Sequence, residues 1–179
     1  MAAMNALQDH FLTLARYHVW ATRRLLDEHI ALLMEADYRR DCGLFFKSIH
    51  GTLNHLLVGE GLLWQRRFIE GVSPAGLNLD DEVEPDRARL AQRLKEVVQA
   101  WLPYIERLSE ADFGQPFHYA TSKGEPISAP FAATLAHVFN HATHHRGQIT
   151  AALTAMGHAS PVLDLIYMLR DEAAAEPRP

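Results

Sequence analysis

Four of the 11 histidines in this 179-residue sequence fall between positions 137 and 148. They are His137, His141, His144 and His145. At about 100° per residue, a helix would place all four on an arc of roughly a quarter of a turn. His141 and His145 adjoin the apolar stripe of the same segment and are four residues apart, so they should point inward as neighbours. Two neutral imidazoles so placed can chelate one divalent ion.

The alternative for these histidines is structural. A pair at this spacing is common on amphipathic helices, where it more often fills a polar face than binds a metal. Four histidines on one face favour a site, but the spacing alone leaves both interpretations open.

A second helix is predicted from about Leu44 to Glu70, with Phe45 in its apolar stripe. It carries His50 and His55, which are about 140° apart on a helical wheel, so both cannot face the same metal. His55 has small neighbours that leave room for an ion and a substrate, and periodicity favours it only slightly. These neighbours are Gly51, Thr52 and Gly59.

The remaining segments complete an all-α pattern. Helices are expected at 5–34, 85–108 and 130–156, with a short fifth, C-terminal helix from Pro161 and a break or kink at Pro103. Residues 35–41 should form a loop and residues 114–130 a hairpin. Four long amphipathic segments favour a four-helix bundle, a single metal-binding domain over 1–172 with a flexible tail at 173–179.

Composition excludes several classes of protein. The net charge of −5 argues against a general nucleic-acid binder. Cys42 is the only cysteine, so neither an intramolecular disulfide nor a thiolate zinc site can form. We expect a cytoplasmic protein without a membrane partner, because the sequence has no secretory leader pattern and no run of about 18 apolar residues.

Common catalytic motifs are absent from the sequence. No Glu-x-x-His occurs, which excludes the carboxylate-bridged di-iron pattern of ferritin-like bundles. His-Glu-x-x-His, Gly-x-Gly-x-x-Gly and P-loop patterns are also missing. What remains is a mononuclear site made of imidazoles.

Three blocks of sequence, 48–60, 137–148 and 161–167, resemble the DinB-like (damage-inducible) metalloenzyme family. The most specific is Asn-His-x-x-His-His-Arg-Gly-Gln, which begins at Asn140. The resemblance implies a four-helix bundle, commonly a homodimer, with one divalent ion, zinc or nickel, held by three histidines. By position these would be His55, His141 and His145. The sequence departs from the family pattern at three positions. Leu63 stands where the family usually has Trp, and His18 and Thr22 stand where it has Asn.

Three neutral imidazoles would leave the ion with an open position, as in catalytic zinc sites. Such an ion can lower the pKa of bound water to about 7, or bind a thiol as thiolate. Because related families include bacillithiol- and mycothiol-dependent S-transferases, a low-molecular-weight thiol is a candidate cofactor. We therefore expect an S-transferase or hydrolase acting on a small molecule. The alternative is a non-catalytic metal-binding or stress-related bundle.

Other residues could complete the site. Glu60, about one and a half turns beyond His55, is a candidate base or hydrogen-bond acceptor, and an exposed or ion-paired role is the alternative. His137 and His144 could line the mouth of the site. The wheel directs Arg146 away from the metal, towards the surface or a dimer contact.

Overall fold

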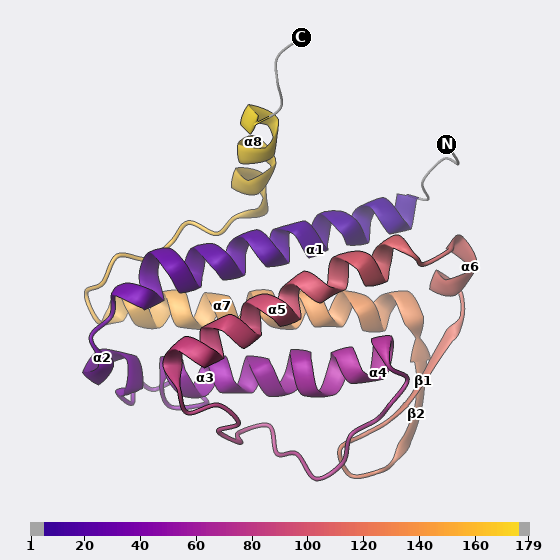
Figure 1. Ribbon diagram of the computed structural model, residues 1–179, viewed down its shortest axis with the longest axis horizontal. Coiled ribbons are helices and arrows are strands. Elements are labelled where there is room, and N and C mark those ends of the chain that lie inside the picture. Colours follow the sequence, from indigo (N-terminus) through magenta and orange to yellow (C-terminus); the bar gives the residue numbers. More distant parts are fainter. Residues whose placement is uncertain (1–5, 176–179) are drawn as a thin grey trace.

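The computed structural model describes residues 6–175, and its main body is a bundle of four long helical segments (Figure 1). The segments are α1 (Ala6–Arg24), α3 (Ile49–Leu56) with its continuations, α5 (Arg87–Glu106) and α7 (Phe131–Ala155). A two-stranded sheet is the only extended structure among the described residues besides an isolated bridge. The expected all-α four-helix bundle is therefore confirmed.

The first segment is longer than its α-helical part. After Arg24 the chain continues through a π-helical turn, Leu25–His29, and a 3-10 turn, Ile30–Leu32. The loop expected at 35–41 is wrong, because Glu35–Arg39 forms the short helix α2. Acidic residues in its first turn and an ion pair between Glu35 and Arg39 stabilise this turn.

The second segment begins at Ile49 rather than near Leu44. The Ser48 hydroxyl caps α3 by accepting the N–H of Gly51. Phe45 precedes the helix and is 83% exposed, so its assignment to the apolar stripe was wrong. The helix then widens into a π-helical segment, Leu57–Gln65, and ends in α4, Arg66–Ile69.

α5 starts at an Asp86 cap and runs past Pro103 to Glu106, so the proline does not end it. After α6, Glu110–Phe113, the expected hairpin is confirmed. Its strands, β1 (Pro116–Ala120) and β2 (Pro126–Pro130), pair antiparallel. β2 leads directly into α7.

The C-terminal helix α8, Leu165–Ala175, begins four residues later than expected from Pro161 and extends away from the bundle (Figure 1). Met168 anchors it, packing with Tyr17 and Ala21 of α1. Part of the expected tail, residues 173–175, belongs to this helix, and residues 176–179 lie outside the described part.

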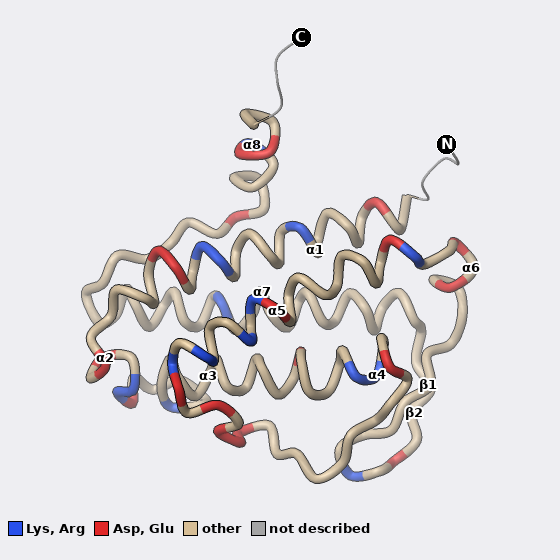
Figure 2. The backbone as a smooth tube through the Cα atoms, viewed as in Figure 1, with Lys and Arg blue, Asp and Glu red and all other residues tan. Residues whose placement is uncertain are grey.

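The bundle interior has two large apolar clusters. One, which includes Leu25, Leu53 and Leu153, packs the first two segments against α7, and the other is rich in aromatic rings, Phe11 and Trp101 among them. Charges of both signs are spread along the helices, with an acidic stretch in the loop before α5 (Figure 2). None of the helices between residues 6 and 175 combines the length and apolar character needed to cross a bilayer.

Candidate metal centre

Two neighbouring helices bring three histidines together. His55 comes from α3, and His141 and His145 come from α7. The Nε2 atom of His141 lies 3.1 Å from Nε2 of His55 and 3.2 Å from Nε2 of His145. Tetrahedral zinc with bonds of about 2.0–2.1 Å to nitrogen requires ligand separations of about 3.3 Å. These two separations are close to that value, and the ligand atoms of all three residues lie within 4.8 Å of one another, so they could hold one ion.

The outer nitrogens of two of these rings are held by oxygen atoms. Nδ1 of His55 lies 2.8 Å from the carbonyl oxygen of Leu79, and Nδ1 of His145 lies 2.8 Å from Oε1 of Gln148. These oxygens can only accept, so each Nδ1 carries the proton and each Nε2 keeps its lone pair. The rings are thus set in the tautomer that a metal requires.

The environment also keeps the histidines neutral. Burial, followed by the neighbouring imidazoles, lowers the pKa of His141 to about 4. Burial likewise lowers the pKa of His145 to about 4, against the opposing effect of the Gln148 hydrogen bond. The pKa of His55 is lowered, mainly by burial. Proton competition for the three lone pairs is therefore weak near pH 7.

Phe46 forms a wall of the centre that the sequence analysis missed. Its ring stacks on His55, with 3.8 Å between centroids and 15° between planes. A Cβ on Gly51 would lie 2.1 Å from the Phe46 carbonyl oxygen, so only glycine permits this approach of the loop. We interpreted Gly51 as leaving room for an ion and a substrate. In the structure it instead leaves room for the backbone of Phe46.

The two other histidines of α7 flank the centre without joining it. The His137 ring lies 5.7 Å from that of His141 and 5.3 Å from Trp64, and the His144 ring lies 4.9 Å from that of His145. Both are exposed. His50, the alternative on α3, instead hydrogen-bonds to the Tyr38 hydroxyl at 3.0 Å.

Glu60 and Arg146 lie inside the bundle. Glu60 is 1% exposed, and its Oε2 lies 2.8 Å from Nε2 of His18. Burial acts to raise the pKa of Glu60, but His18 and Arg146 outweigh it and the net shift is downward. The surface position expected for Arg146 was wrong, since it is 3% exposed and contacts His18. The wheel failed because α7 packs against α1 as well as α3.

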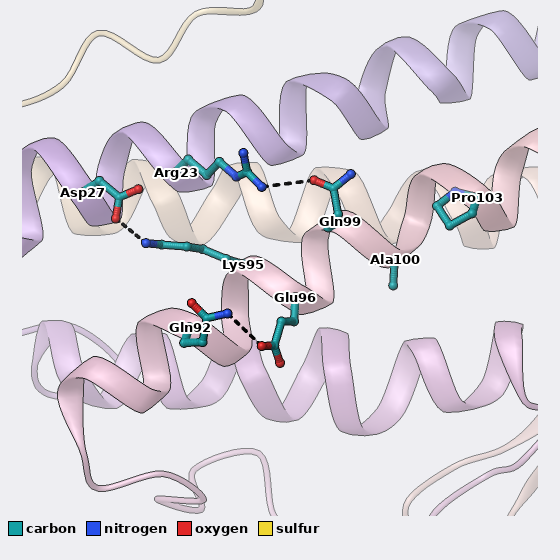
Figure 3. Close-up of a pocket in the computed structure, with 8 residues that line it drawn as sticks. All are labelled: Arg23, Asp27, Gln92, Lys95, Glu96, Gln99, Ala100 and Pro103. Atoms are coloured by element: carbon teal, nitrogen blue, oxygen red, sulfur yellow. Dashed lines mark hydrogen bonds and ion pairs between the residues drawn. The ribbon is translucent and has the colours of Figure 1, made fainter.

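A hollow of about 650 Å³ between α1 and α5 is separate from this centre (Figure 3). Its polar side chains form hydrogen bonds or ion pairs with one another, and none of them is a histidine. The pairs are Lys95 with Asp27, Arg23 with Gln99, and Gln92 with Glu96. This hollow therefore lacks the imidazole donors of the histidine centre.

Comparison with known proteins agrees with this architecture. A sequence model of the DinB family matches residues 4–178. The chain belongs to the DinB family. Among DinB-family relatives, "Protein DinB" of Bacillus subtilis (strain 168) is 26% identical over 176 residues, which cover 94% of this chain and 100% of that protein.

A solved structure has the same DinB-family fold. YfiT from Bacillus subtilis, described as "a probable metal-dependent hydrolase with an unusual four-helix bundle topology", superposes with a TM-score of 0.66. The match covers 89% of this chain and 93% of that one, at 14% sequence identity. At this identity the likeness establishes the fold alone.

Proposed function

We propose that the protein is a metal-dependent enzyme whose single divalent ion, zinc or nickel, is held by His55, His141 and His145. The convergence of three Nε2 atoms from two helices carries the proposal. It is supported by the two Nδ1 atoms already bound to oxygen acceptors. A structural role in the core would not require three imidazoles whose ligand atoms all lie within 4.8 Å of one another.

The ligand set favours a catalytic ion over a structural one. Among residues 6–175, no further histidine, cysteine or carboxylate joins the three donors within ligand spacing. Three protein ligands leave a coordination position for water or substrate. When bound, such an ion lowers the pKa of water to about 7 or binds a thiol as thiolate, and either is a nucleophile.

A pocket next to the centre is our candidate substrate site. It has a volume of about 820 Å³ and is lined by Phe46, whose ring stacks on His55, and by Leu79, whose carbonyl holds His55. Both Lys47 and Asp80 reach its lining, so charges of both signs are available. This size and lining suit a small polar molecule.

Hydrolysis is the leading reaction, and the description of YfiT supports it. Thiol S-transfer with a low-molecular-weight thiol is the second candidate, because three neutral ligands leave the full charge of the ion for an anionic sulfur. The test is a panel of esters, amides and electrophiles with metal-loaded protein, with and without thiol and chelator. Turnover without thiol supports the hydrolase and thiol-dependent turnover the transferase. A filled fourth protein ligand in metal-edge spectra, with no turnover, would support the non-catalytic bundle.

We also propose that the protein acts as a homodimer through α8. This helix extends away from the bundle (Figure 1). It has large apolar side chains that the described residues leave exposed. The exposed large apolar residues on and before it are Val162, Ile166, Tyr167 and Leu169. A second copy of the chain would cover them.

A further inference from the structure

Three polar side chains form a continuous row inside the bundle. They are Arg146 of α7, His18 of α1 and Glu60 of the π-helical segment, each at most 3% exposed. Nη1 of Arg146 lies 2.8 Å from Nδ1 of His18, and Nε2 of His18 lies 2.8 Å from Oε2 of Glu60. Three helical segments therefore meet through charged or polar groups at a place where apolar packing is the rule.

The donors in this row determine where its proton lies. A guanidinium can only donate, so Nδ1 of His18 accepts from Arg146 and the ring proton is on Nε2. That proton is donated to the Glu60 carboxylate. His18 is thus a neutral bridge between a buried cation and a buried anion, and each charge is compensated through it.

The row ends at Glu60, whose second carboxylate oxygen, Oε1, has no partner within residues 6–175. Among the described residues, Oε1 of Glu60 is the only buried side-chain oxygen without a hydrogen-bond partner. Nδ1 of His141 is also buried without one. The backbone places them in the same region, since a Cβ on Gly59 would lie 3.4 Å from Cε1 of His141. An unused acceptor and an unused ring nitrogen therefore lie on neighbouring parts of α7 and the π-helical segment.

Binding of an ion would give both atoms a role. A ligand that uses Nε2 must carry its ring proton on Nδ1, and that N–H needs an acceptor when buried. His55 and His145 already have neutral oxygen acceptors for this purpose. His141 lacks one, and the available oxygen belongs to a carboxylate.

We propose that Glu60, His18 and Arg146 are positioning residues for His141, with Oε1 of Glu60 accepting the Nδ1 proton of the metal-bound ring. This inference rests on the proposed metal site and specifies how it is tuned. A carboxylate partner makes His141 a more basic ligand, which donates more electron density to the metal than the two ligands with neutral partners. Arg146 and His18 fix the carboxylate from the opposite side.

The test replaces the bridge and measures metal binding directly. His18→Phe keeps a ring but removes both hydrogen bonds, and His18→Gln keeps an amide oxygen for Arg146 and an NH₂ group for Glu60. We expect zinc affinity, measured by competition with a chromophoric chelator, to fall about 10- to 100-fold in H18F and to stay within about threefold of wild type in H18Q. The matched control is His10→Gln, an exposed histidine of the same helix, which should bind zinc like wild type.

Equal zinc affinity of folded H18F and wild type would overturn the proposal. If wild type itself binds no zinc through the three histidines, the proposed function fails instead, so the two failures are distinguishable. A second measurement does not depend on H18F folding. In ¹⁵N spectra of the zinc-loaded wild type, the Nδ1 proton of His141 should be strongly downfield and slow to exchange, and Glu60→Gln should move it upfield. An unchanged proton in E60Q contradicts the proposal.

Discussion

Nε2 of His55 and Nε2 of His141 lie 3.1 Å apart, although 86 residues separate them in the chain. The contact crosses from α3 to α7, so it exists only when the bundle has formed. A metal held there would bind the folded state and not the unfolded one, which couples metal affinity to stability.

Loss of one histidine of the three should abolish tight metal binding. Structural zinc sites with four ligands provide about 10–16 kcal/mol, so removal of one of three ligands should weaken binding by at least about a hundredfold. We expect His55→Ala and His145→Ala to be purified without stoichiometric metal, as measured by elemental analysis of untagged protein. His144→Ala, an exposed neighbour, should retain wild-type metal content. Equal loss in all three variants would contradict the assignment.

Metal-free protein should lose stability in mild acid. The folded-state pKa of His141 and of His145 is about 4, below the unfolded value of about 6.5. Between these values the unfolded chain binds more protons, so the free energy of unfolding falls as pH decreases from about 6.5 to about 4. Urea titrations across this range should show a decrease on the order of a few kcal/mol.

The histidines themselves provide the control for that measurement. His145→Gln removes one shifted group and should flatten the pH dependence, whereas His144→Gln should leave it unchanged. A wild-type free energy of unfolding that stays constant from pH 6.5 to pH 4 would show that the folded-state pKa values are not lowered.

Phe46→Ala should weaken substrate binding without removing the metal. Removal of the ring takes away part of the pocket lining and the ring that stacks on His55, so substrate positioning should suffer while all three ligands remain. We expect the zinc content to be unchanged and KM to rise at least about tenfold, because the lost contact with the ring is worth roughly 1.4 kcal/mol. Leu32→Ala is the control, because that side chain is 79% exposed and lies outside the pocket. Equal kinetics for both variants would remove Phe46 from the site.

Two glycine substitutions should have opposite effects on stability. In Gly51→Ala the new Cβ meets the Phe46 carbonyl oxygen at 2.1 Å, so the loop must move, and we expect a loss of about 1–3 kcal/mol. In Gly147→Ala the Cβ enters open space on an exposed part of α7, and the gain should be about 0.5–1 kcal/mol. Chemical denaturation measures both. A neutral G51A would show that the loop does not need this close approach.

The oligomeric state tests the role of α8. Ile166→Glu combined with Leu169→Glu should convert a dimer into a monomer in light scattering, because both side chains are exposed and apolar in the single chain. Leu32→Glu, at another exposed apolar position, should leave the dimer intact. A monomeric wild type would contradict the proposal.

Periodicity predicts the helices and the inward pair His141 and His145, because those signals are local to one helix. It could not choose between His50 and His55, since that choice depends on which helix lies opposite; the family resemblance pointed to His55. Phe46 carries no periodic signal, because it lies in a tight loop where Lys47 adopts a φ of 67°.

Arg146 and Glu60 show a second limit of sequence reasoning. A wheel assumes one buried face for each helix, but α7 contacts both α1 and α3, so Arg146 is covered by a second neighbour. The wheel also assumes uniform rotation, which fails once the second segment becomes π-helical at Leu57. Glu60 lies just beyond that point and contacts His18.

The π-helical segment makes the number of residues from 57 to 65 a constraint on the site. Each residue of an i→i+5 turn rotates the chain about the helix axis by less than the roughly 100° of an α-helix. The segment therefore changes the direction in which the side chains after His55 point. Deleting a single residue here would rotate the downstream half relative to that ligand by one residue's angle, which is somewhat less than about 100°. Glu60 would then leave His18, and Gly61 would no longer face Val97, whose side chain leaves no space for a Cβ there. Relatives that keep this centre should therefore keep the number of residues in this segment.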